Sequence, residues 1–468
     1  MAKKFIPEQF NSLEVVDITT RGKGVVKSED GKVMFVSGVI PGDKISVETY
    51  KKRRGYFEAK LIEILEPSPD RVTPKCQHFG VCGGCKWQNM NYHAQLHFKQ
   101  KDISHQLKNF SGMLLPNIDK IHAAPKTYFY RNKMEYAFSN QRWLSAQEIA
   151  NKSMVIEKKG IGFHKAGMWD KVVDIHHCHL QPEPANEIRN AIKAYALEHG
   201  LDFFNPKDQN GLLRSLMIRN SNGGEFMVLI QFFRENKAQR VDLLEHLKKH
   251  FDITSLLYCI NSKANDTLYD QKIICYHGKN YITEEMEGLN FKINAKSFFQ
   301  TNTEQAYELY KITREFAGLK GKELVYDLYT GTGTIAQFIA KDCAKVVGVE
   351  SVPEAIEAAR VNAEENGIKN AFFEVGDMRK VFNQDFVDRH GRADLVITDP
   401  PRNGMHPDVV KQLLYLEPEK IIYVSCNPAT QARDLFLMKS KYKLIRSIAV
   451  DMFPQTQHIE NVVLLEKR

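Results

Sequence analysis

The stretch that decides the fold is residues 327–334, which read Asp-Leu-Tyr-Thr-Gly-Thr-Gly-Thr. It closes an apolar run and opens a segment with helical periodicity. Glycines at such a point permit a tight turn and let a ligand approach the backbone, with a helix amino terminus behind it. A Gly-x-Gly turn does not choose its ligand, because Gly331 to Ala336 also fits the dinucleotide fingerprint. The turn therefore predicts a nucleotide-binding α/β fold.

Outward from this turn, short apolar stretches alternate with amphipathic segments of helical length. This order is typical of a doubly wound parallel sheet. Two more stretches at the end of the chain, 443–450 and 460–465, have no room for a helix between them. We predict that they form an antiparallel pair at the sheet edge, with the last one beside the fifth strand. The five predicted parallel strands are 323–328, 345–349, 371–375, 394–398 and 420–425.

Carboxylates stand at the ends of three of these strands. Glu350 ends the second, where it can accept both hydroxyls of a ribose, and Asp377 follows the third, where it can reach an adenine edge. Residues 399–402, Asp-Pro-Pro-Arg, set a rigid turn after the fourth strand. A nicotinamide enzyme has no need of this turn. An S-adenosylmethionine methyltransferase of the Rossmann-like class I fold does, because an acceptor must lie in line with the methyl group. Amino-group methylases commonly carry an aromatic residue after Asp-Pro-Pro, and Arg402 at that place weakens this alternative.

The fifth strand ends in residues 425–428, Ser-Cys-Asn-Pro, just before a predicted helix. The helix dipole can lower a thiol pKa from ~8.5 to between ~3.5 and ~7.5, which makes Cys426 a candidate nucleophile; a buried structural cysteine is the alternative. His458 and Glu460 precede the last strand, and Glu460 suits a general base because apolar neighbours raise the proton affinity of a carboxylate.

A cysteine nucleophile, a base and a methyl donor together indicate methylation at carbon 5 of uracil. In that reaction a thiolate adds to carbon 6, the resulting enolate takes the methyl group at carbon 5, the base removes the proton there, and the thiolate leaves.

The amino-terminal part reads differently. Residues 11–66 contain short alternating strands with turn signals, which predict a small barrel. Lys51–Arg54 followed by Tyr56 and Phe57 suits phosphate contact and base stacking, although lysines also protect edge strands. Prolines after residue 66 mark a linker, 92–110 is predicted to be helical, and the middle of the chain reads as α+β.

Four cysteines form a set in this middle part. Cys76, Cys82 and Cys85 lie on one short segment, and Cys178 follows about a hundred residues later among histidines. Four thiolates can hold zinc or an iron–sulfur cluster. Three ligands plus a remote one favour iron–sulfur, and the histidines keep a mixed zinc site open. The cysteines predicted to be core residues are Cys259, Cys275 and Cys343.

Charge is concentrated in the same region. Lys and Arg exceed Asp and Glu by 8 over 468 residues, and residues 67–180 alone hold 16 basic against 8 acidic residues. This predicts a surface for a polyanion; a solvated basic face is the alternative. With no run of ~20 apolar residues, we expect a cytoplasmic protein without membrane contact.

Taken in series, the motifs at 399–402, 425–428 and 451–460 resemble the RNA (uracil-5-)-methyltransferase family, in particular its bacterial 23S ribosomal RNA branch. The resemblance implies that Cys426 is the nucleophile and Glu460 the base. It also implies contacts with S-adenosylmethionine around the Gly331 turn. The implied or expected cofactor contacts are Gln300, Tyr329, Gly331, Glu350, Asp377 and Asp399.

The resemblance further implies that the barrel is an RNA-gripping, oligonucleotide-binding-like TRAM domain. It implies a [4Fe-4S] cluster on Cys76, Cys82, Cys85 and Cys178, and an RNA role for Arg131 and Lys133. We expect a multidomain protein with a barrel at 1–66, an α+β iron–sulfur and RNA-contacting domain at 67–285, and a methyltransferase domain at 286–468. We expect a monomer without an obligate protein partner, acting on structured RNA. Transfer RNA as substrate, or an RNA-binding or assembly module with a relict fold, are the alternatives.

Overall fold

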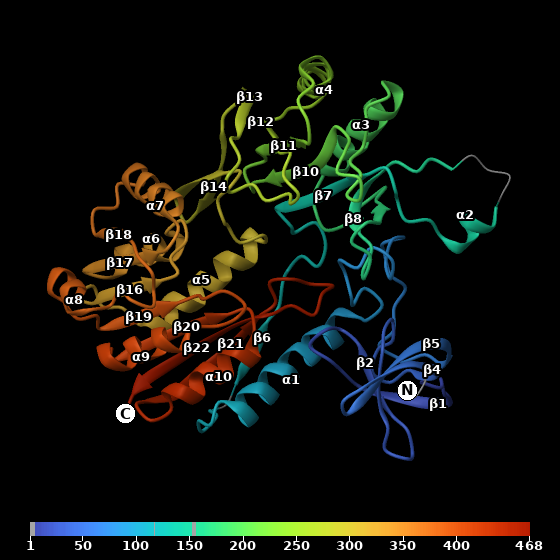
Figure 1. Cartoon of the computed structure of the whole chain (residues 1–468). Coiled ribbons are helices and arrows are strands. Elements are labelled where there is room, and N and C mark those ends of the chain that lie inside the picture. The colour runs from blue at the N-terminus through green and yellow to red at the C-terminus, as the bar shows by residue number, and fades with distance from the viewer. Residues whose placement is uncertain (1–4, 117, 152–155) are drawn as a thin grey trace.

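The computed structural model describes residues 5–116, 118–151 and 156–468, so the first four residues of the predicted 1–66 unit lie outside it. Three bodies follow one another: a barrel, a central sheet with helices on it, and a larger carboxyl-terminal sheet. Figure 1 colours them from blue to red, and in both views the central sheet lies above the other two bodies. Within these ranges, none of the helices has both the length and the apolar character needed to cross a membrane.

The barrel is closed and has five strands in the order β1-β2-β3-β5-β4. Alternate residues such as Val26, Met34 and Ile45 fill its interior, as a strand period of two requires. The predicted small barrel is therefore confirmed, and the basic cluster at Lys51–Arg54 lies at its β4–β5 hairpin. The strands are β1 Gln9–Ile18, β2 Gly24–Lys27, β3 Val33–Val36, β4 Lys44–Arg53 and β5 Tyr56–Glu66.

The carboxyl-terminal sheet has eight strands in the order β18-β17-β16-β19-β20-β22-β21-β6. Its first five neighbours are parallel, as predicted, and β22 returns antiparallel beside β20. Side chains alternate between two hydrophobic clusters, one on each face, which is why the strands read as continuous apolar runs. The strands are β16 Leu324–Leu328, β17 Lys345–Glu350, β18 Ala371–Val375, β19 Leu395–Thr398, β20 Lys420–Ser425, β21 Tyr442–Val450 and β22 Glu460–Lys467.

Helices connect these strands over both faces, as in a doubly wound sheet. The helix that follows β20 begins at Pro428, close to the predicted position, and Asn427 caps it by accepting a hydrogen bond from the Ala429 amide at 3.2 Å. The helices are α5 Thr303–Ala317, α6 Thr334–Ile339, the short 3-10 turn Ala340–Asp342, α7 Pro353–Glu365, α8 Gln384–His390, α9 Pro407–Leu416 and α10 Pro428–Met438.

One segment from before the middle domain joins this sheet. Helix α1, Tyr92–Phe110, packs on α10, and β6, Asp119–His122, pairs in parallel with β21. The antiparallel pairing of β21 and β22 is confirmed, but β21 is not the sheet edge, because β6 covers it. Figure 1 shows α1 between the sheet and the barrel. Helix α1 and strand β6 therefore belong structurally to the carboxyl-terminal sheet.

The central sheet has seven strands in the order β13-β12-β11-β10-β7-β8-β9. Cys259 and Cys343 are buried as predicted, whereas Cys275 is exposed because β13 is an edge strand. The elements are β7 Lys133–Ser139, α2 Ala146–Ala150, β8 Gly160–His164, β9 Val172–Asp174, α3 Ala185–Glu198, β10 Leu213–Asn220, β11 Phe226–Phe232, α4 Lys237–His250, β12 Ser255–Ile260 and β13 Ile274–Gly278, followed by the hairpin β14 Tyr281–Met286 and β15 Leu289–Asn294.

Candidate active site

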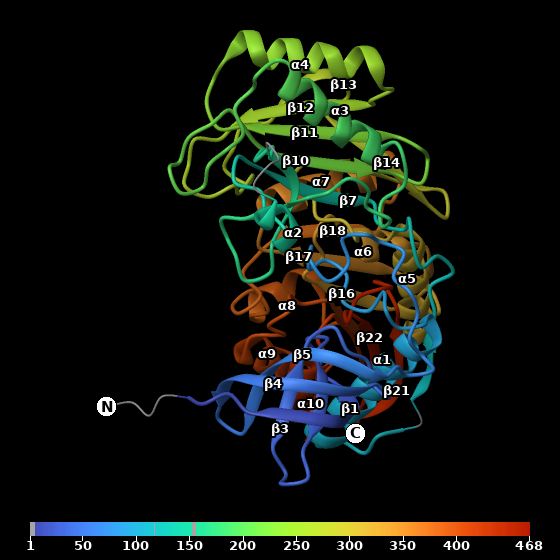
Figure 2. The ribbon, with the colours of Figure 1, turned by 90° about the vertical axis from the view of Figure 1, so that its right-hand side faces the viewer.

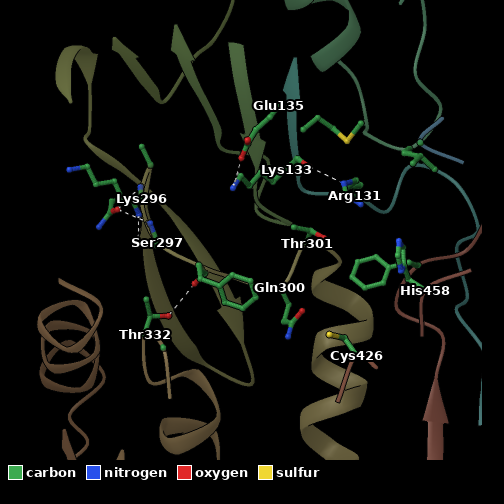
Figure 3. A pocket seen from close by; sticks show the side chains of 18 of the residues that line it. Arg131, Lys133, Glu135, Lys296, Ser297, Gln300, Thr301, Thr332, Cys426 and His458 are labelled. Atoms are coloured by element: carbon green, nitrogen blue, oxygen red, sulfur yellow. Dashed lines mark hydrogen bonds and ion pairs between the residues drawn. The ribbon is translucent and has the colours of Figure 1, made fainter. Parts of the chain in front are cut away.

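A cavity of about 1630 Å³ lies where the carboxyl ends of the parallel strands face the central sheet. Ligands bind at this edge in open α/β sheets. Figure 3 shows side chains from both bodies around it. Of the predicted site residues, all but Asp377 line the cavity: Cys76, Cys82, Cys85, Arg131, Lys133, Cys178, Gln300, Tyr329, Gly331, Glu350, Asp399, Cys426 and Glu460.

The turn after β16 places Tyr329 and Gly331 on the cavity wall. Tyr329 has a φ of 60°, an uncommon value for a bulky residue, and Gly331 has a φ of 57°. A β-carbon on Gly331 would meet nothing within 4 Å, so this turn is open to a ligand. Gly333 is needed for packing instead, since a β-carbon there would lie 2.7 Å from the Phe373 ring.

Glu350, at the end of β17, is held by the turn that follows it. Its Oε1 accepts hydrogen bonds from the amide of Ser351 at 2.7 Å and of Val352 at 3.1 Å. Its Oε2 accepts from the Gly331 amide at 3.3 Å. The carboxylate is thereby fixed next to the glycine turn, where it can accept the hydroxyls of a ribose.

Gln300 lies on a loop that the central body holds in place. Asn132, just before β7, donates from its side chain to the Gln300 carbonyl at 2.9 Å and from its amide to the Thr301 carbonyl at 2.9 Å. Arg219, from β10, donates to the Ser297 carbonyl at 2.6 Å. In Figure 3 the Gln300 side chain extends into the same space as Cys426. Asn132 and Arg219 were not among the predicted site residues, because only the packing of two bodies brings them to this loop.

Asp377 lies elsewhere. It is not among the residues that line the cavity, and it pairs with Arg379 at 2.6 Å. This pairing lowers the pKa of its carboxyl to about 2. Asp377 is therefore not part of the cavity lining, although its charge still acts on Tyr329.

Strand register places Cys426 opposite Glu460. Ser425 of β20 pairs with Asn461 of antiparallel β22, so the residue after Ser425 and the residue before Asn461 are neighbours across the ladder. Glu460 is 4% exposed, and Asp399 lines the same wall. The thiol and two carboxyl groups thus lie together at the end of the sheet.

Electrostatics at this wall differs from the prediction. Burial, followed by the charges of Glu460 and Asp399, raises the pKa of the Cys426 thiol to about 12, and Arg402 only partly opposes this. The predicted lowering by the helix dipole is therefore wrong for the structure without ligands, because desolvation and two acids outweigh the dipole.

The two carboxyl groups are also shifted. Burial raises the pKa values of Asp399 and Glu460, and their proximity raises that of Glu460 further, while Arg402 lowers it. Buried Asp327, which sequence reasoning did not single out, adds negative charge behind Asp399. Such a site retains protons and favours a positively charged ligand.

The segment between β21 and β22 is anchored to distant parts of the chain. Asp451 forms a fully buried ion pair with Lys99 of α1 at 2.6 Å and accepts a hydrogen bond from the Tyr92 hydroxyl at 2.9 Å. The Pro454 carbonyl accepts from the Tyr130 hydroxyl at 2.9 Å. These contacts give residues 451–454 a structural role beside Glu460.

His458 and Arg402 form a pair on the cavity wall that spacing did not reveal. Nδ1 of His458 lies 2.5 Å from the Arg402 guanidinium, and burial followed by Arg402 lowers the pKa of His458 to about 4. The imidazole is therefore neutral near pH 7 and accepts the hydrogen bond from Arg402. Glu460, rather than His458, is the stronger proton acceptor here.

Arg131 and Lys133 line the side of the cavity opposite the sheet. The Arg131 Nε donates to the Lys133 carbonyl at 3.1 Å, and Lys133 pairs with Glu135 at 2.6 Å. Figure 3 shows both side chains at the end of β7, above Cys426. They are placed to meet a ligand that enters the cavity from this side.

The four cysteines of the set line the cavity from loops rather than strands. Burial raises the pKa of each thiol, and charges on Cys76 and Cys178 act on Cys82. Among the residues that the structure describes, no three or more His, Cys, Asp or Glu side chains are grouped tightly enough to hold one metal ion.

Comparisons with known proteins agree with this arrangement. The family model described as tRNA (uracil-5-)-methyltransferase matches residues 224–468. An RNA methyltransferase of Bacteroides thetaiotaomicron is 51% identical, covering 96% of this chain and all of the relative, and one of Porphyromonas gingivalis is 49% identical, covering 97% and 99%.

A solved structure extends the likeness to three dimensions. The tRNA (uracil-54, C5)-methyltransferase of Pyrococcus abyssi, in complex with S-adenosyl-L-homocysteine, is 30% identical with a TM-score of 0.75, covering 97% of this chain and 99% of that one. With the cavity, the strand-end acids and the paired Cys426 and Glu460 in place, the chain belongs to the RNA (uracil-5-)-methyltransferase family of S-adenosylmethionine-dependent enzymes.

Proposed function

We propose that this enzyme methylates carbon 5 of a uridine in structured RNA through a covalent adduct between Cys426 and carbon 6, giving 5-methyluridine. The observation that carries the proposal is the register of β20 and β22, which puts Cys426 and Glu460 side by side on the cavity wall. A thiol paired with a carboxyl group at a methyl-donor site suits this reaction better than methylation of an amino group, which needs no cysteine.

The residues for the methyl donor are present around the turn after β16. Tyr329 and Gly331 would lie against its nucleoside part, Glu350 would accept its ribose hydroxyls, and Gln300 and Asp399 would face its reacting end. S-adenosylmethionine supplies the methyl group and a positive sulfonium charge. This charge suits a wall on which Asp399 and Glu460 have raised pKa values.

Cys426 begins the chemistry on the RNA base. Its thiol loses a proton to water, and the sulfur forms a bond to carbon 6 while the C5–C6 π pair moves toward the carbonyl oxygen. Carbon 5 of this enolate then takes the methyl group. Arg402 is the nearby cation that opposes the rise in the pKa of Cys426 and so favours the thiolate.

Glu460 completes the reaction. Its carboxylate accepts the proton from carbon 5, the C5–C6 double bond re-forms, and the bond from sulfur to carbon 6 breaks, returning the electron pair to Cys426. The raised pKa of Glu460 makes it a stronger base than an exposed glutamate. The net products are 5-methyluridine, S-adenosylhomocysteine and one proton.

Among RNA classes, we place 23S ribosomal RNA first, because the cysteine spacing resembles that branch of the family. Transfer RNA is the second candidate, because it is the substrate of the Pyrococcus abyssi enzyme. Arg131, Lys133 and the basic hairpin of the barrel would meet RNA phosphates, and the barrel would act as a TRAM domain. Since one chain lines the whole cavity, we propose that it acts as a monomer.

We propose that Cys76, Cys82, Cys85 and Cys178 hold a [4Fe-4S] cluster. The donor set fits: four thiols line one space, and the charges of Cys76, Cys82 and Cys178 all act on Cys85. Three cysteines on one segment with a remote fourth favour such a cluster over a zinc ion. The four ligands would tie the 67–91 loop to the central domain.

We retain the division into a barrel at 1–66, a central domain and a methyltransferase domain at 286–468 as a proposal. Helix α1 and β6 are the exception, because they pack with the methyltransferase sheet.

Mapping 5-methyluridine in RNA from cells with and without the gene tests the proposed function. We expect one or a few 5-methyluridines to disappear from 23S ribosomal RNA while transfer RNA is unchanged. Loss confined to transfer RNA would select the second candidate, and no change in either fraction would overturn the proposal.

A further inference from the structure

Beside the cysteine loops, five side chains form a cluster of rings around one cation. We call it the ring cluster; its members are Lys75, Tyr128, Phe129, His177 and His179. The Phe129 ring lies 6.0 Å from that of His179 and 6.5 Å from that of His177, and the two imidazoles are 4.4 Å apart. Most of these pairs meet edge to face, which is a favourable aromatic geometry.

Lys75 places a charge on this cluster. Its ammonium nitrogen lies 5.1 Å from the centre of the Tyr128 ring and 4.9 Å from that of Phe129. Both distances suit a cation–π contact, and Lys75 itself is exposed. Rings and a cation together are the chemistry with which proteins hold an unstacked base and its phosphate.

The backbone turns Phe129 outward by an unusual conformation. Phe129 has a φ of 55°, a genuine outlier for a bulky residue, and its amide donates to the His179 carbonyl at 2.8 Å. The ring is 37% exposed, whereas Tyr130 next to it is 7% exposed and belongs to the central hydrophobic core. A backbone held in this way to expose a large ring points to binding rather than packing.

The ring cluster adjoins the catalytic cavity. His177 and His179 line the same cavity as Cys426, and Arg131, two residues after Phe129, lines it as well. We propose that the ring cluster is a stacking platform for one unpaired base of the substrate RNA, separate from the uridine that reaches Cys426. This inference rests on the proposed function, in which RNA is the substrate. It explains why the exposed rings lie beside the cavity that the RNA enters.

The test measures binding of two single-stranded probes by fluorescence anisotropy: a 12-nucleotide oligouridylate and a ribose-phosphate strand of equal length without bases. Stacking on an aromatic ring is tolerant of sequence, so any base serves. We expect Phe129→Ala to weaken binding of oligouridylate about 5- to 100-fold and to leave binding of the abasic strand unchanged. Phe129→Tyr, which keeps a ring, should bind like the wild type.

Phe436→Ala is the matched control, because Phe436 is 48% exposed and has Lys439 3.6 Å from its ring centre, but lies outside the cavity. It should bind both probes like the wild type. Unchanged oligouridylate binding by Phe129→Ala overturns the platform, and so does an equal loss for both probes. Neither binding measurement depends on methyl transfer. An enzyme that makes no 5-methyluridine would refute the proposed function, and the binding results would still test the stacking platform.

Discussion

The two walls of the cavity hold their functional side chains by different means. On the sheet wall, Cys426 and Glu460 are fixed by the hydrogen-bonded register of β20 and β22. On the opposite wall, Cys76, Cys82 and Cys85 lie between residues 71 and 91, where the chain forms turns and one isolated bridge. A ladder of backbone bonds needs no ligand to place its side chains, whereas buried thiols on loops need one to cross-link them.

If Cys426 on the sheet wall is the nucleophile, its replacement should give the largest loss of methyl transfer. Cys426→Ala should lower methyl transfer at least about 10⁴-fold, because the adduct cannot form. Binding of S-adenosylmethionine, measured by calorimetry, should persist, since Gln300 and Glu350 are untouched. With RNA that carries 5-fluorouridine, the wild type should form a stable protein–RNA adduct and this variant none.

Cys343→Ala is the control, because this thiol is buried in the hydrophobic core and does not line the cavity. Retained turnover in Cys426→Ala would refute the covalent mechanism and point to amino-group methylation.

The partner across the ladder should give a smaller and different loss. Glu460→Gln should slow turnover by about 10²- to 10⁴-fold, because the proton stays on carbon 5 after methyl transfer. The adduct should then accumulate on ordinary RNA and be visible on a denaturing gel. In the wild type, kcat/KM should fall as the pH decreases. This fall should occur at a higher pH than the pKa of an ordinary glutamate, because the pKa of Glu460 is raised.

Glu466→Gln, on the same strand but paired with Lys443 at the surface, is the control and should remain active. Normal turnover without adduct in Glu460→Gln would assign the base to another group.

The loop wall predicts a loss of stability rather than of chemistry. Cys178→Ser should lower the free energy of unfolding of the central domain by about 2–4 kcal/mol, by analogy with a disulfide that closes a loop of this length. RNA affinity should fall, while affinity for S-adenosylmethionine should not change. Differential scanning calorimetry and separate binding titrations measure these effects.

Cys275→Ser serves as the control for the melting temperature only, because its thiol is exposed but lines the cavity. A Cys178→Ser protein with wild-type melting temperature and RNA affinity would contradict a cross-linking role for the four cysteines.

The smallest effect should come from the contact that joins the walls. Asn132→Ala removes the side-chain hydrogen bond to the Gln300 carbonyl and one to Thr303 at 2.8 Å. Each such bond contributes about 1 kcal/mol, so the loss of both should raise KM for S-adenosylmethionine by up to about 30-fold with kcat little changed. Asn140→Ala, just beyond the other end of β7, is the control. An equal fall in kcat at constant KM would show that Asn132 does not position the cofactor loop.

Much of the fold could be predicted because the strands of a buried parallel sheet are short apolar runs that end in turns. Strand β18 and helix α1 have the predicted bounds, and the antiparallel return of β22 followed from the lack of room for a helix. The place of β6 could not be predicted, because its four residues gain a partner only after 320 residues of chain have folded beside them.

The candidate site divides in the same way. The strand-end residues Glu350, Asp399 and Cys426 follow from the position of each strand, which the local sequence reveals. Asp377 shows the limit of this reasoning, since it follows a strand end but pairs with Arg379 and does not line the cavity. The thiol pKa of Cys426 shows it too, because desolvation depends on everything packed around the group.

The sequence by itself determined where the parallel strands lie along the chain, the glycine turn, the family and the residues that can do chemistry. These depend on residue type and spacing along the chain. Only the tertiary structure decided which of them meet. The pairing of Cys426 with Glu460, the support of Gln300 by Asn132 and the ring cluster around Phe129 join segments from 34 to more than 100 residues apart. Such contacts form only when the whole chain is folded, and their geometry is set by packing and backbone hydrogen bonds rather than by any local pattern.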